Sequence, residues 1–393
     1  MYQALYRKWR PMSFDDVVSQ PHITTTLKNQ IKSGKTAHAY LFTGSRGTGK
    51  TTCARIFAKA INCLDPHDGE PCLECEICKD ADNGTLSDII EIDAASNSKV
   101  DDIRELREGV VYTPERCKYK VYIIDEVHML SAGAFNALLK TMEEPPPHVK
   151  FILATTEIHK VPATIVSRCQ HFDFHRIRNE DIVSRLMYIA SQEGFTLHED
   201  AAGMIARLSD GGMRDALSLL DQCVAYENDI TLDVVSSASG IAGRDYLFDI
   251  LEKIAEKDAA GALRVVDKLY DMSKDLKVLA GELLAQMRNV MIIKTIDNNK
   301  DLITCLPDEY ERLKALAERM KLDEILGDIN TLQECSERFA KSTSKRIELE
   351  MCIIKLCGAA QKAGATVQAV SGNAEITVLL NRITQLENAL KNG

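Results

Sequence analysis

The first part of the chain alternates short apolar runs with amphipathic stretches. Apolar residues recur at helical spacing between the runs, as Ile23, Leu27 and Ile31 do before Gly34. Strands that alternate with helices indicate an α/β domain with a mainly parallel sheet covered on both faces. The runs typical of buried strands occupy residues 39–42, 87–92, 120–124, 151–154 and 170–174.

Local signals indicate where several helices begin and end. Ser13 and Asp16 resemble a capping box, which predicts that the first long helix begins there. A helix over 132–144 is stopped by three consecutive prolines. A further helix carries its apolar residues on one face: Val100, Ile103, Leu106 and Val110.

The pattern changes after residue 178, and nine of the ten prolines lie at or before Pro162. Residues 179–242 predict three or four helices, and residues 243–362 predict a helical bundle. Small and polar residues over 366–374 indicate a linker. The chain then ends either in a short partner-binding helix or at a truncation. That helix would carry its apolar residues at heptad spacing: Ile376, Leu379, Ile383, Leu386 and Leu390.

Composition limits the classes of protein that fit. The 393 residues suffice for two or three domains with substantial cores. No apolar run approaches a membrane span and the N-terminus lacks an apolar signal core, so we expect a cytoplasmic protein with no membrane partner. Its twelve cysteines are then expected to be reduced or metal-bound. The net charge of −10 argues against a uniformly basic surface for nucleic acid, but not against a local basic face.

The strongest chemical signal is a phosphate loop that fits G-x-x-x-x-G-K-[ST] at every fixed position. Its glycines let backbone N–H groups point at phosphate oxygens, and helix formers at 54–60 place a positive helix end behind them. Lys50 would reach the β- and γ-phosphates of ATP, and the Thr51 hydroxyl would bind Mg²⁺. The alternative is a plain glycine-rich turn, which a complete match between strand and helix disfavours. The loop comprises Gly44, Ser45, Arg46, Gly47, Thr48, Gly49, Lys50 and Thr51, and Thr52 follows it.

Polar residues at the ends of later strands supply partners for this loop. Asp125 would hold Mg²⁺ directly or through water, and Glu126 would orient and deprotonate the attacking water. Thr155 at a strand tip can sense the γ-phosphate or water, although threonine is also simply common in strands. Arg214 lies in the first turn of a predicted helix, where a cation opposes the helix dipole, and this favours a ligand role.

A second strong signal is a cluster of cysteines with the spacing C-x8-C-x2-C-x2-C. Four thiolates at this spacing can close a tetrahedral zinc site, and a site with no free position is structural. His67 lies between them and can replace one ligand, and a reduced thiol cluster without metal is the alternative. The four cysteines are Cys63, Cys72, Cys75 and Cys78.

The first eleven residues mix aromatic and basic side chains, including Tyr2, Tyr6, Trp9 and Arg10. Such a segment is often a frayed arm. The chain's only tryptophan and two tyrosines within nine residues instead favour a segment that packs.

With these residues in place, the chain resembles the gamma/tau subunits of bacterial DNA polymerase III, the ATPases of the clamp loader, over about residues 1–362. The residues that carry the resemblance are Ala4–Pro11, the four-cysteine insertion, Asp125–His128 and Ser167–Cys169. It implies an α/β fold of the AAA+ class followed by two helical domains. The implied domains are an ATPase domain at 1–178 with a zinc module at about 62–80, a helical lid at 179–242, a helical collar for oligomerisation at 243–365, and a linker with a short amphipathic helix at 366–393.

The resemblance also implies roles for single residues. Thr155 matches the first sensor, and Arg214 matches the second sensor, which contacts the γ-phosphate from the lid. Arg168 matches an arginine finger that acts on ATP bound to a neighbouring subunit. Its alternative is a surface arginine that caps the preceding helical turn. The N-terminal arm, with Val17 and Val18, would enclose the adenine.

The implied function is ATP hydrolysis within the DNA polymerase III holoenzyme. ATP binding at subunit interfaces would open the sliding clamp, and primer–template DNA would trigger hydrolysis and release of the clamp. The implied partners are the delta and delta prime subunits, further gamma/tau copies, the beta clamp and DNA. A form that continues past Gly393 would also bind the replicative helicase and polymerase. Lys99 and Arg104 are candidates for contacts with DNA phosphates, or are two solvated cations.

Two other functions compete with this one. An AAA+ helicase or remodeller would share the nucleotide residues and the finger, but would lack the four-cysteine insertion and the Ser-Arg-Cys sequence. A non-hydrolysing scaffold subunit of the loader would be expected to have lost Lys50 or the acidic pair, and both are intact. We therefore expect an ATPase with ATP, Mg²⁺ and Zn²⁺ as cofactors.

Overall fold

The computed structural model describes residues 3–96, 106, 108–239, 245–297, 299, 302–303, 305, 307–339, 342 and 344–358. These residues divide into two compact units, one within 1–239 and the other within 240–393. Lys99, Arg104 and the heptad segment at 376–390 lie outside the described residues, as does most of the helix predicted around Ile103.

A five-stranded parallel sheet forms the centre of the first unit, with the strand order β2-β3-β4-β1-β5. All five predicted strands are confirmed, and their bounds are β1 (Ala39–Gly44), β2 (Ile89–Asp93), β3 (Lys120–Asp125), β4 (Val149–Thr155) and β5 (Gln170–Phe174). β4 is buried at every position and β1 at all but its last, as expected for central strands of a sheet covered on both faces.

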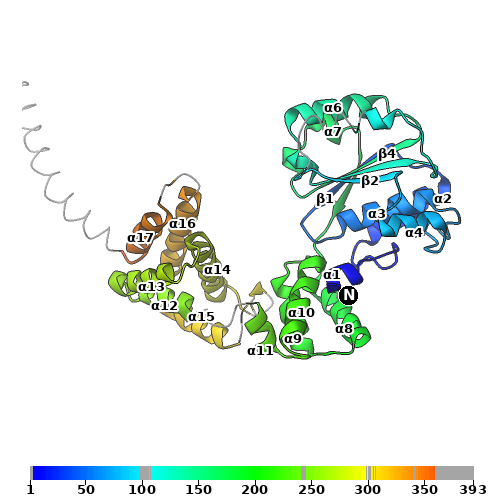
Figure 1. The fold of residues 1–393 in the computed structure, drawn as a ribbon. Coiled ribbons are helices and arrows are strands. Elements are labelled where there is room, and N and C mark those ends of the chain that lie inside the picture. The colour runs from blue at the N-terminus through cyan, green and yellow to red at the C-terminus, as the bar shows by residue number, and fades with distance from the viewer. Residues whose placement is uncertain are drawn as a thin grey trace, which may run out of the picture. The chain divides into compact units, whose positions relative to one another are not determined.

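Helices cover both faces of this sheet (Figure 1). One face packs against α2 (Pro21–Ser33) and α3 (Lys50–Asn62), with α4 (Glu76–Asn83) beside α3, and the other carries α6 (Ala132–Glu143) and α7 (Ala163–Val166). Side chains of β1 alternate between the two cores: Tyr40 and Phe42 face α3, whereas Leu41 joins the core under α6. The carboxyl ends of β1, β3 and β4 therefore meet at one edge of the sheet.

The first long helix begins later than the sequence predicted. Ser13 Oγ donates to Asp16 Oδ2 at 2.9 Å, so the two side chains bond to each other and cap no helix. α2 instead begins at Pro21 after Gln20, because proline suits the first helical position. The capping-box prediction is wrong, whereas the predicted end at Gly34 is confirmed by its left-handed φ of 67°.

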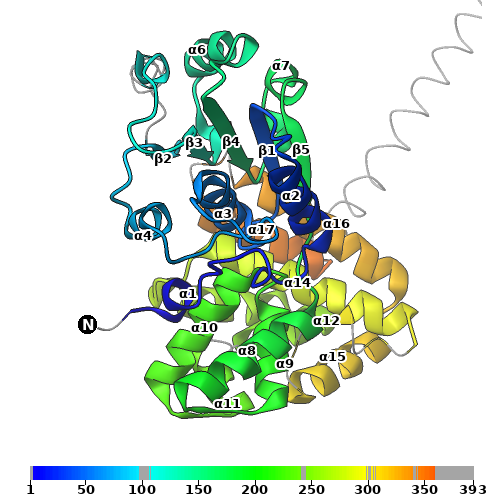
Figure 2. The same ribbon diagram turned by 90° about the vertical axis from the view of Figure 1, so that its right-hand side faces the viewer.

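The rest of the first unit is mostly helical, as predicted, with four helices after the sheet. The N-terminal helix α1 packs against α10, so the described part of the N-terminal arm is packed rather than frayed (Figure 2). A two-stranded sheet of β6 and β7 was not predicted, because two-residue strands carry no readable periodicity. The elements are α1 (Leu5–Lys8), η1 (Val127–Met129), η2 (Ile158–Lys160), α8 (Asn179–Glu193), β6 (Thr196–Leu197), α9 (Glu199–Leu208), α10 (Met213–Tyr226), β7 (Asp229–Ile230) and α11 (Leu232–Ala238).

The second unit is a helical bundle around one apolar core, which confirms that prediction. α14 supplies Leu279, Leu283 and Met287 to this core at helical spacing. Within the described residues of both units, no helix combines the length and apolar character needed to cross a membrane. The bundle comprises α12 (Asp245–Ala255), α13 (Ala259–Asp271), α14 (Leu276–Thr295), α15 (Pro307–Arg319), α16 (Leu322–Arg338) and α17 (Lys345–Leu356).

Candidate nucleotide and metal sites

The phosphate loop joins β1 to α3 at the carboxyl edge of the sheet. Gly44, Gly47 and Gly49 have φ angles of 130°, 78° and 106°, which side chains disfavour. A Cβ on Gly44 would also lie 2.2 Å from the carbonyl oxygen of Phe174 on β5. Glycine is therefore required where the motif fixes it, and also at position 47, which the motif leaves free.

Lys50 is buried at the start of α3, and its Nζ donates to the carbonyl oxygens of Gly44 and Ser45 at 2.8 and 2.7 Å. Burial lowers the pKa of Lys50, while the nearby carboxylates of Glu126 and Asp125 favour its charged form. The ammonium group is thus held against the loop and within the field of the acidic pair.

The predicted magnesium ligands lie in contact. Thr51 Oγ1 donates to Asp125 Oδ2 at 2.6 Å, although β1 and β3 are separated by β4 in the sheet. Asp125 Oδ1 accepts the backbone N–H of Glu126 at 2.9 Å, which orients the carboxylate toward α3. A hydroxyl and a carboxylate side by side are oxygen donors of the kind Mg²⁺ prefers, so these residues fit the ion.

Glu126 follows Asp125 in a left-handed conformation, with a φ of 47°. Its Oε2 accepts from the backbone N–H and the hydroxyl of Thr156 at 3.3 and 3.1 Å, and lies 3.4 Å from Nδ1 of His128. Neither Thr156 nor His128 has a role predicted from the sequence. The available signal was the position of His128 in the Asp125–His128 segment.

Thr155 is fully buried at the end of β4. Its Oγ1 lies 3.0 Å from His128 Nδ1 and accepts the backbone N–H of Glu157 at 3.0 Å. His128 thus contacts both Thr155 and Glu126, and its Nε2 lies 3.1 Å from Glu157 Oε2. The His128 side chain therefore lies between the predicted sensor, Thr155, and the predicted base, Glu126.

The helix that carries Arg214 begins against the phosphate loop. The backbone N–H of Met213 donates to the carbonyl oxygen of Gly47 at 3.1 Å, and the Arg214 guanidinium lies 5.2 Å from the ring centre of Tyr6. Val17 lies near the other end of the loop, with its Cγ1 4.0 Å from a Cβ built on Gly49. Val18 is half-buried next to it.

Arg168 bonds to helices on the other face of the sheet. Its Nη1 donates to the carbonyl oxygen of Thr164 on α7 at 2.7 Å, and its Nη2 donates to Glu143 Oε1 on α6 at 2.8 Å. The Thr164 contact is the one expected of a capping arginine. A finger role would require contact between Arg168 and nucleotide bound to a neighbouring subunit.

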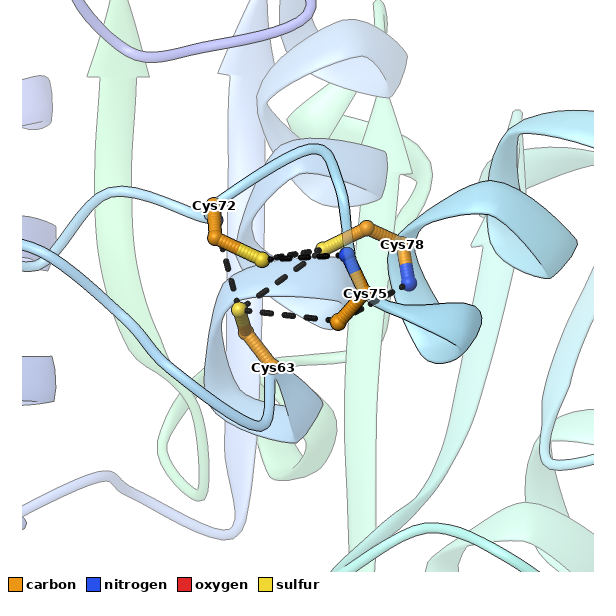
Figure 3. Close-up of side chains that lie close together, drawn as sticks. All are labelled: Cys63, Cys72, Cys75 and Cys78. Carbon is orange, nitrogen blue, oxygen red and sulfur yellow. Dashed lines mark hydrogen bonds between the residues drawn. The ribbon is translucent and has the colours of Figure 1, made fainter.

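The four cysteines converge on one point (Figure 3). Their sulfur atoms all lie within 4.8 Å of one another, with Sγ–Sγ distances of 3.7 Å for Cys63–Cys78 and 4.0 Å for Cys72–Cys78. A tetrahedral site with Zn–S bonds of about 2.3 Å requires sulfurs about 3.8 Å apart. The cluster fits zinc, whereas the exposed His67 lies outside it and its Nε2 is 3.3 Å from Asp65.

Hydrogen bonds to sulfur also favour metal-binding thiolates. Backbone N–H groups donate to Cys63, Cys72 and Cys75 at 3.3–3.5 Å. Burial opposes ionisation of Cys75, but hydrogen bonds from the backbone of Leu64 and Cys78 outweigh it and lower the pKa to about 7.

The cysteine module is attached to the sheet domain by a partly buried ion pair. Lys59 on α3 is almost fully buried, and its Nζ lies 2.7 Å from Asp82 on α4. On the other side, the Glu70 carboxylate accepts the backbone N–H groups of Phe14 and Asp15. The module therefore braces the segment that leads to Val17.

Comparisons with known proteins place the whole described architecture in one family. Family models match three successive segments: "DNA polymerase III, delta subunit" over residues 19–178, "DNA polymerase III clamp loader subunit, ATPase lid domain" over 181–229, and "DNA polymerase III subunits gamma and tau domain III" over 230–368. The parallel sheet with its phosphate loop, followed by a helical lid and a further helical domain, is the order of domains that the resemblance implied.

Relatives extend this match over nearly the full chain. DNA polymerase III subunit tau of Bacillus subtilis is 42% identical over 99% of this chain and 68% of its own length. Subunit tau/gamma of Haemophilus influenzae is 39% identical over 90% of this chain and 51% of its own. Subunit gamma of Buchnera aphidicola from Acyrthosiphon pisum is 35% identical over 91% and 99%. This chain therefore belongs to the gamma/tau family of DNA polymerase III clamp-loader subunits.

Proposed function

We propose that this protein hydrolyses ATP to drive loading of a sliding clamp onto primer–template DNA. The observation that carries the proposal is the contact between Thr51 and Asp125 beside Glu126. It supports the proposal because Lys50, Thr51 and the acidic pair lie together at one edge of the sheet, and the helix that carries Arg214 begins against the phosphate loop. A non-hydrolysing scaffold has no need of this arrangement.

Each of these residues would have its own role in ATP binding or hydrolysis. Lys50 and the loop N–H groups bind the phosphates, and Mg²⁺, held by Thr51 and Asp125, neutralises charge on the β- and γ-oxygens. Glu126 takes the proton of the attacking water, and its Oε2 is already fixed by Thr156. Arg214 contacts the γ-phosphate from the lid. Val17 and Val18, with the N-terminal arm, enclose the adenine.

The protein would act in the cytoplasm within an assembly. We propose that the helical second unit holds this chain to further gamma/tau copies and to delta and delta prime subunits, and that the ring opens a beta clamp. Arg168 would then reach ATP in the adjacent subunit, and a longer C-terminal form would contact helicase and polymerase. The cysteine cluster would hold one structural zinc ion.

DNA contacts are proposed for Lys99 and Arg104. If these cations meet phosphates, Lys99→Ala and Arg104→Ala weaken primed-DNA binding by the assembled loader, and each lowers the salt slope by about one. Unchanged affinity and slope would assign them to solvent.

One assay tests the proposed function as a whole. ATP hydrolysis is measured for the full chain alone, and then with primed DNA, sliding clamp and the other loader subunits. We expect slow hydrolysis alone and strong stimulation by the complete set. Hydrolysis that is absent under every condition, although ATP binds, would instead support a scaffold subunit.

A further inference from the structure

His128 is a polar side chain at the carboxyl edge of the sheet whose role the sequence leaves open. It lies in the turn η1, directly after the fully buried Val127, and its side chain is only 7% exposed. Its two ring nitrogens face different partners. Nε2 lies 3.1 Å from Glu157 Oε2, whereas Nδ1 lies 3.0 Å from Thr155 Oγ1 and 3.4 Å from Glu126 Oε2.

These contacts decide which ring nitrogen carries the proton. Lys160 Nζ donates to Glu157 Oε2 at 2.7 Å, and this hydrogen bond, against the opposite effect of burial, lowers the pKa of Glu157. The Glu157 carboxylate is therefore ionised and can only accept. Nε2 of His128 must carry a proton and donate it to this carboxylate. In the neutral ring, Nδ1 then has no proton and can only accept a hydrogen bond.

The single acceptor Nδ1 thus faces two oxygen atoms. Thr155 Oγ1 accepts the backbone N–H of Glu157 and donates its own proton to Nδ1. A deprotonated Glu126 carboxylate has no proton to donate, so its 3.4 Å contact with Nδ1 is not a hydrogen bond in this state. It becomes a hydrogen bond once Glu126 gains a proton, as a general base does during the reaction.

We propose that His128 is a positioning residue for ATP hydrolysis, and that its Nδ1 accepts first from the Thr155 hydroxyl and then from the protonated Glu126. This inference rests on the proposed function, because it requires Glu126 as the base and Thr155 as the sensor of the γ-phosphate. When the Thr155 hydroxyl donates to the γ-phosphate instead, Nδ1 is left free to accept from another group.

The proton can then be followed through the reaction. The oxygen of the attacking water bonds to the γ-phosphorus, and the bond from that phosphorus to the β-phosphate oxygen breaks. The water gives one proton to Glu126, whose Oε2–H donates to Nδ1 of His128, and Glu126 later releases the proton to solvent. This hydrogen bond exists only after the proton has moved, so it stabilises the transition state and not bound ATP. Hydrolysis should therefore depend on His128, whereas ATP affinity should not.

The test compares two amides that each replace one ring nitrogen. The amide oxygen of asparagine can take the place of Nδ1, whereas the longer glutamine places its amide near Nε2 and has no atom at the position of Nδ1. Single-turnover ATP hydrolysis is measured with the full chain, primed DNA, sliding clamp and the other loader subunits. His128→Gln is expected to lower this rate by about 10- to 100-fold, and His128→Asn is expected to lower it less. Both variants should bind Mg-ATP as tightly as the wild type in a titration.

Two further variants show whether the effect acts through Glu126. His159→Gln is the matched control, because this exposed histidine lies next to the same carboxylate, with its Nε2 3.8 Å from Glu157 Oε1. It should hydrolyse ATP at the wild-type rate. In a Glu126→Gln chain, the added His128→Gln change should cause no further loss, because Nδ1 acts through the Glu126 carboxyl group.

A merely structural role of His128 gives a different result. It predicts a lower melting temperature together with equal hydrolysis rates for the folded His128→Asn and His128→Gln chains, and that outcome overturns the inference. A loss from His128→Gln that persists in full in the Glu126→Gln chain also overturns it. If His128→Gln does not fold, His128→Ala takes its place, and His128→Asn must then hydrolyse ATP faster than His128→Ala.

Failure of the proposed function is distinguishable from failure of this inference. A wild-type assembly that hydrolyses no ATP, or a Glu126→Gln assembly that hydrolyses it at the wild-type rate, contradicts the proposed function. A wild type that depends on Glu126, with a His128→Gln variant that hydrolyses ATP equally fast, contradicts only the role of His128.

Discussion

The two compact units differ in how their buried charged side chains are paired. In the first unit, buried Lys50 and Thr155 are hydrogen-bonded and lie with Asp125 and Glu126 at one edge of the sheet. In the second, the buried Asp328 on α16 lies within a helical bundle, and its Oδ2 has no hydrogen-bond partner. Buried polar side chains that lie together and form hydrogen bonds with one another indicate a functional site. A single buried polar side chain without a hydrogen-bond partner instead lowers the folding stability.

The largest effect that tests this contrast is expected from Glu126→Gln. The change keeps the shape of the side chain and removes the proposed base, so hydrolysis should fall by up to roughly 10⁴-fold. ATP binding should persist, because Glu126 is not needed to hold the phosphates. Steady-state hydrolysis and ATP titration of the same preparation separate the two quantities.

The matched control is Asp328→Asn, the same carboxyl-to-amide change in the second unit. It should leave the hydrolysis rate of the isolated chain unchanged. If both variants lowered the rate equally, the assignment of chemistry to the first unit alone would fail.

The next largest effect concerns Arg168, which we proposed to act on ATP bound to a neighbouring subunit. A guanidinium supplied in trans completes neutralisation of the transferred phosphoryl group, so Arg168→Ala should lower DNA- and clamp-stimulated hydrolysis by as much as roughly 10³-fold. Nucleotide binding by the isolated chain should barely change, because Arg168 bonds to Thr164 and Glu143 there.

Mixing variants decides whether Arg168 acts between chains. Interfaces that combine an intact Arg168 from a Lys50→Ala chain with an intact Lys50 from an Arg168→Ala chain should recover activity. Co-assembly without any recovery would assign Arg168 to its capping contact on α7.

The cysteine module is expected to affect stability more than rate. Cys75→Ser should abolish stoichiometric zinc and lower the melting temperature, because a closed four-thiolate site contributes folding energy. The ATP turnover rate of the protein that remains folded should change by less than about tenfold. The reason is that the sulfur atoms of the cluster form their hydrogen bonds with one another and with the backbone of the cluster, and not with the phosphate loop. Elemental analysis supplies the zinc count. Cys223→Ala, which changes a buried cysteine on α10, should keep the metal. A wild type without zinc would remove this prediction.

Much of the first unit could be predicted from sequence because its signals are local. The phosphate loop requires glycine at particular backbone angles, and central parallel strands are apolar throughout. Both features can therefore be recognised in a few consecutive residues of the sequence. The Thr51–Asp125 contact followed from the rule that such strands end at the same edge. The start of α2 did not follow, because Ser13 and Asp16 have the right spacing but bond to each other.

The missed residues depend on contacts that are remote in the chain. His128 meets Thr155 only because η1 packs beside β4, which lies further along the chain. Thr156 binds Glu126 between the neighbouring ends of β4 and β3. Neither contact leaves a spacing pattern in the sequence.

The smallest expected effect concerns the pH dependence of the second unit. Burial, against an opposing attraction from Lys257, raises the pKa of Asp328 from 3.8 to about 6. The folded state therefore holds this proton more tightly than the unfolded state. The protonated Asp328 therefore contributes its full share of the folding stability below about pH 4. This contribution is lost as the pH rises to about 6, and above that pH the folding stability no longer depends on Asp328 titration.

Asp328→Asn removes this loss, because the amide cannot ionise. At pH 8 the variant should be more stable than the wild type by roughly 1–3 kcal/mol, and near pH 4 the two should be nearly equal. Calorimetry of the full chain at both pH values, with the transition of the second unit followed separately, measures the difference. A gain that is the same at pH 4 and pH 8 would mean that the introduced amide packs better for reasons unrelated to charge. A loss at pH 8 would mean that Lys257 pairs with the Asp328 carboxylate strongly enough to offset its burial, and the contrast between the two units would then be one of degree.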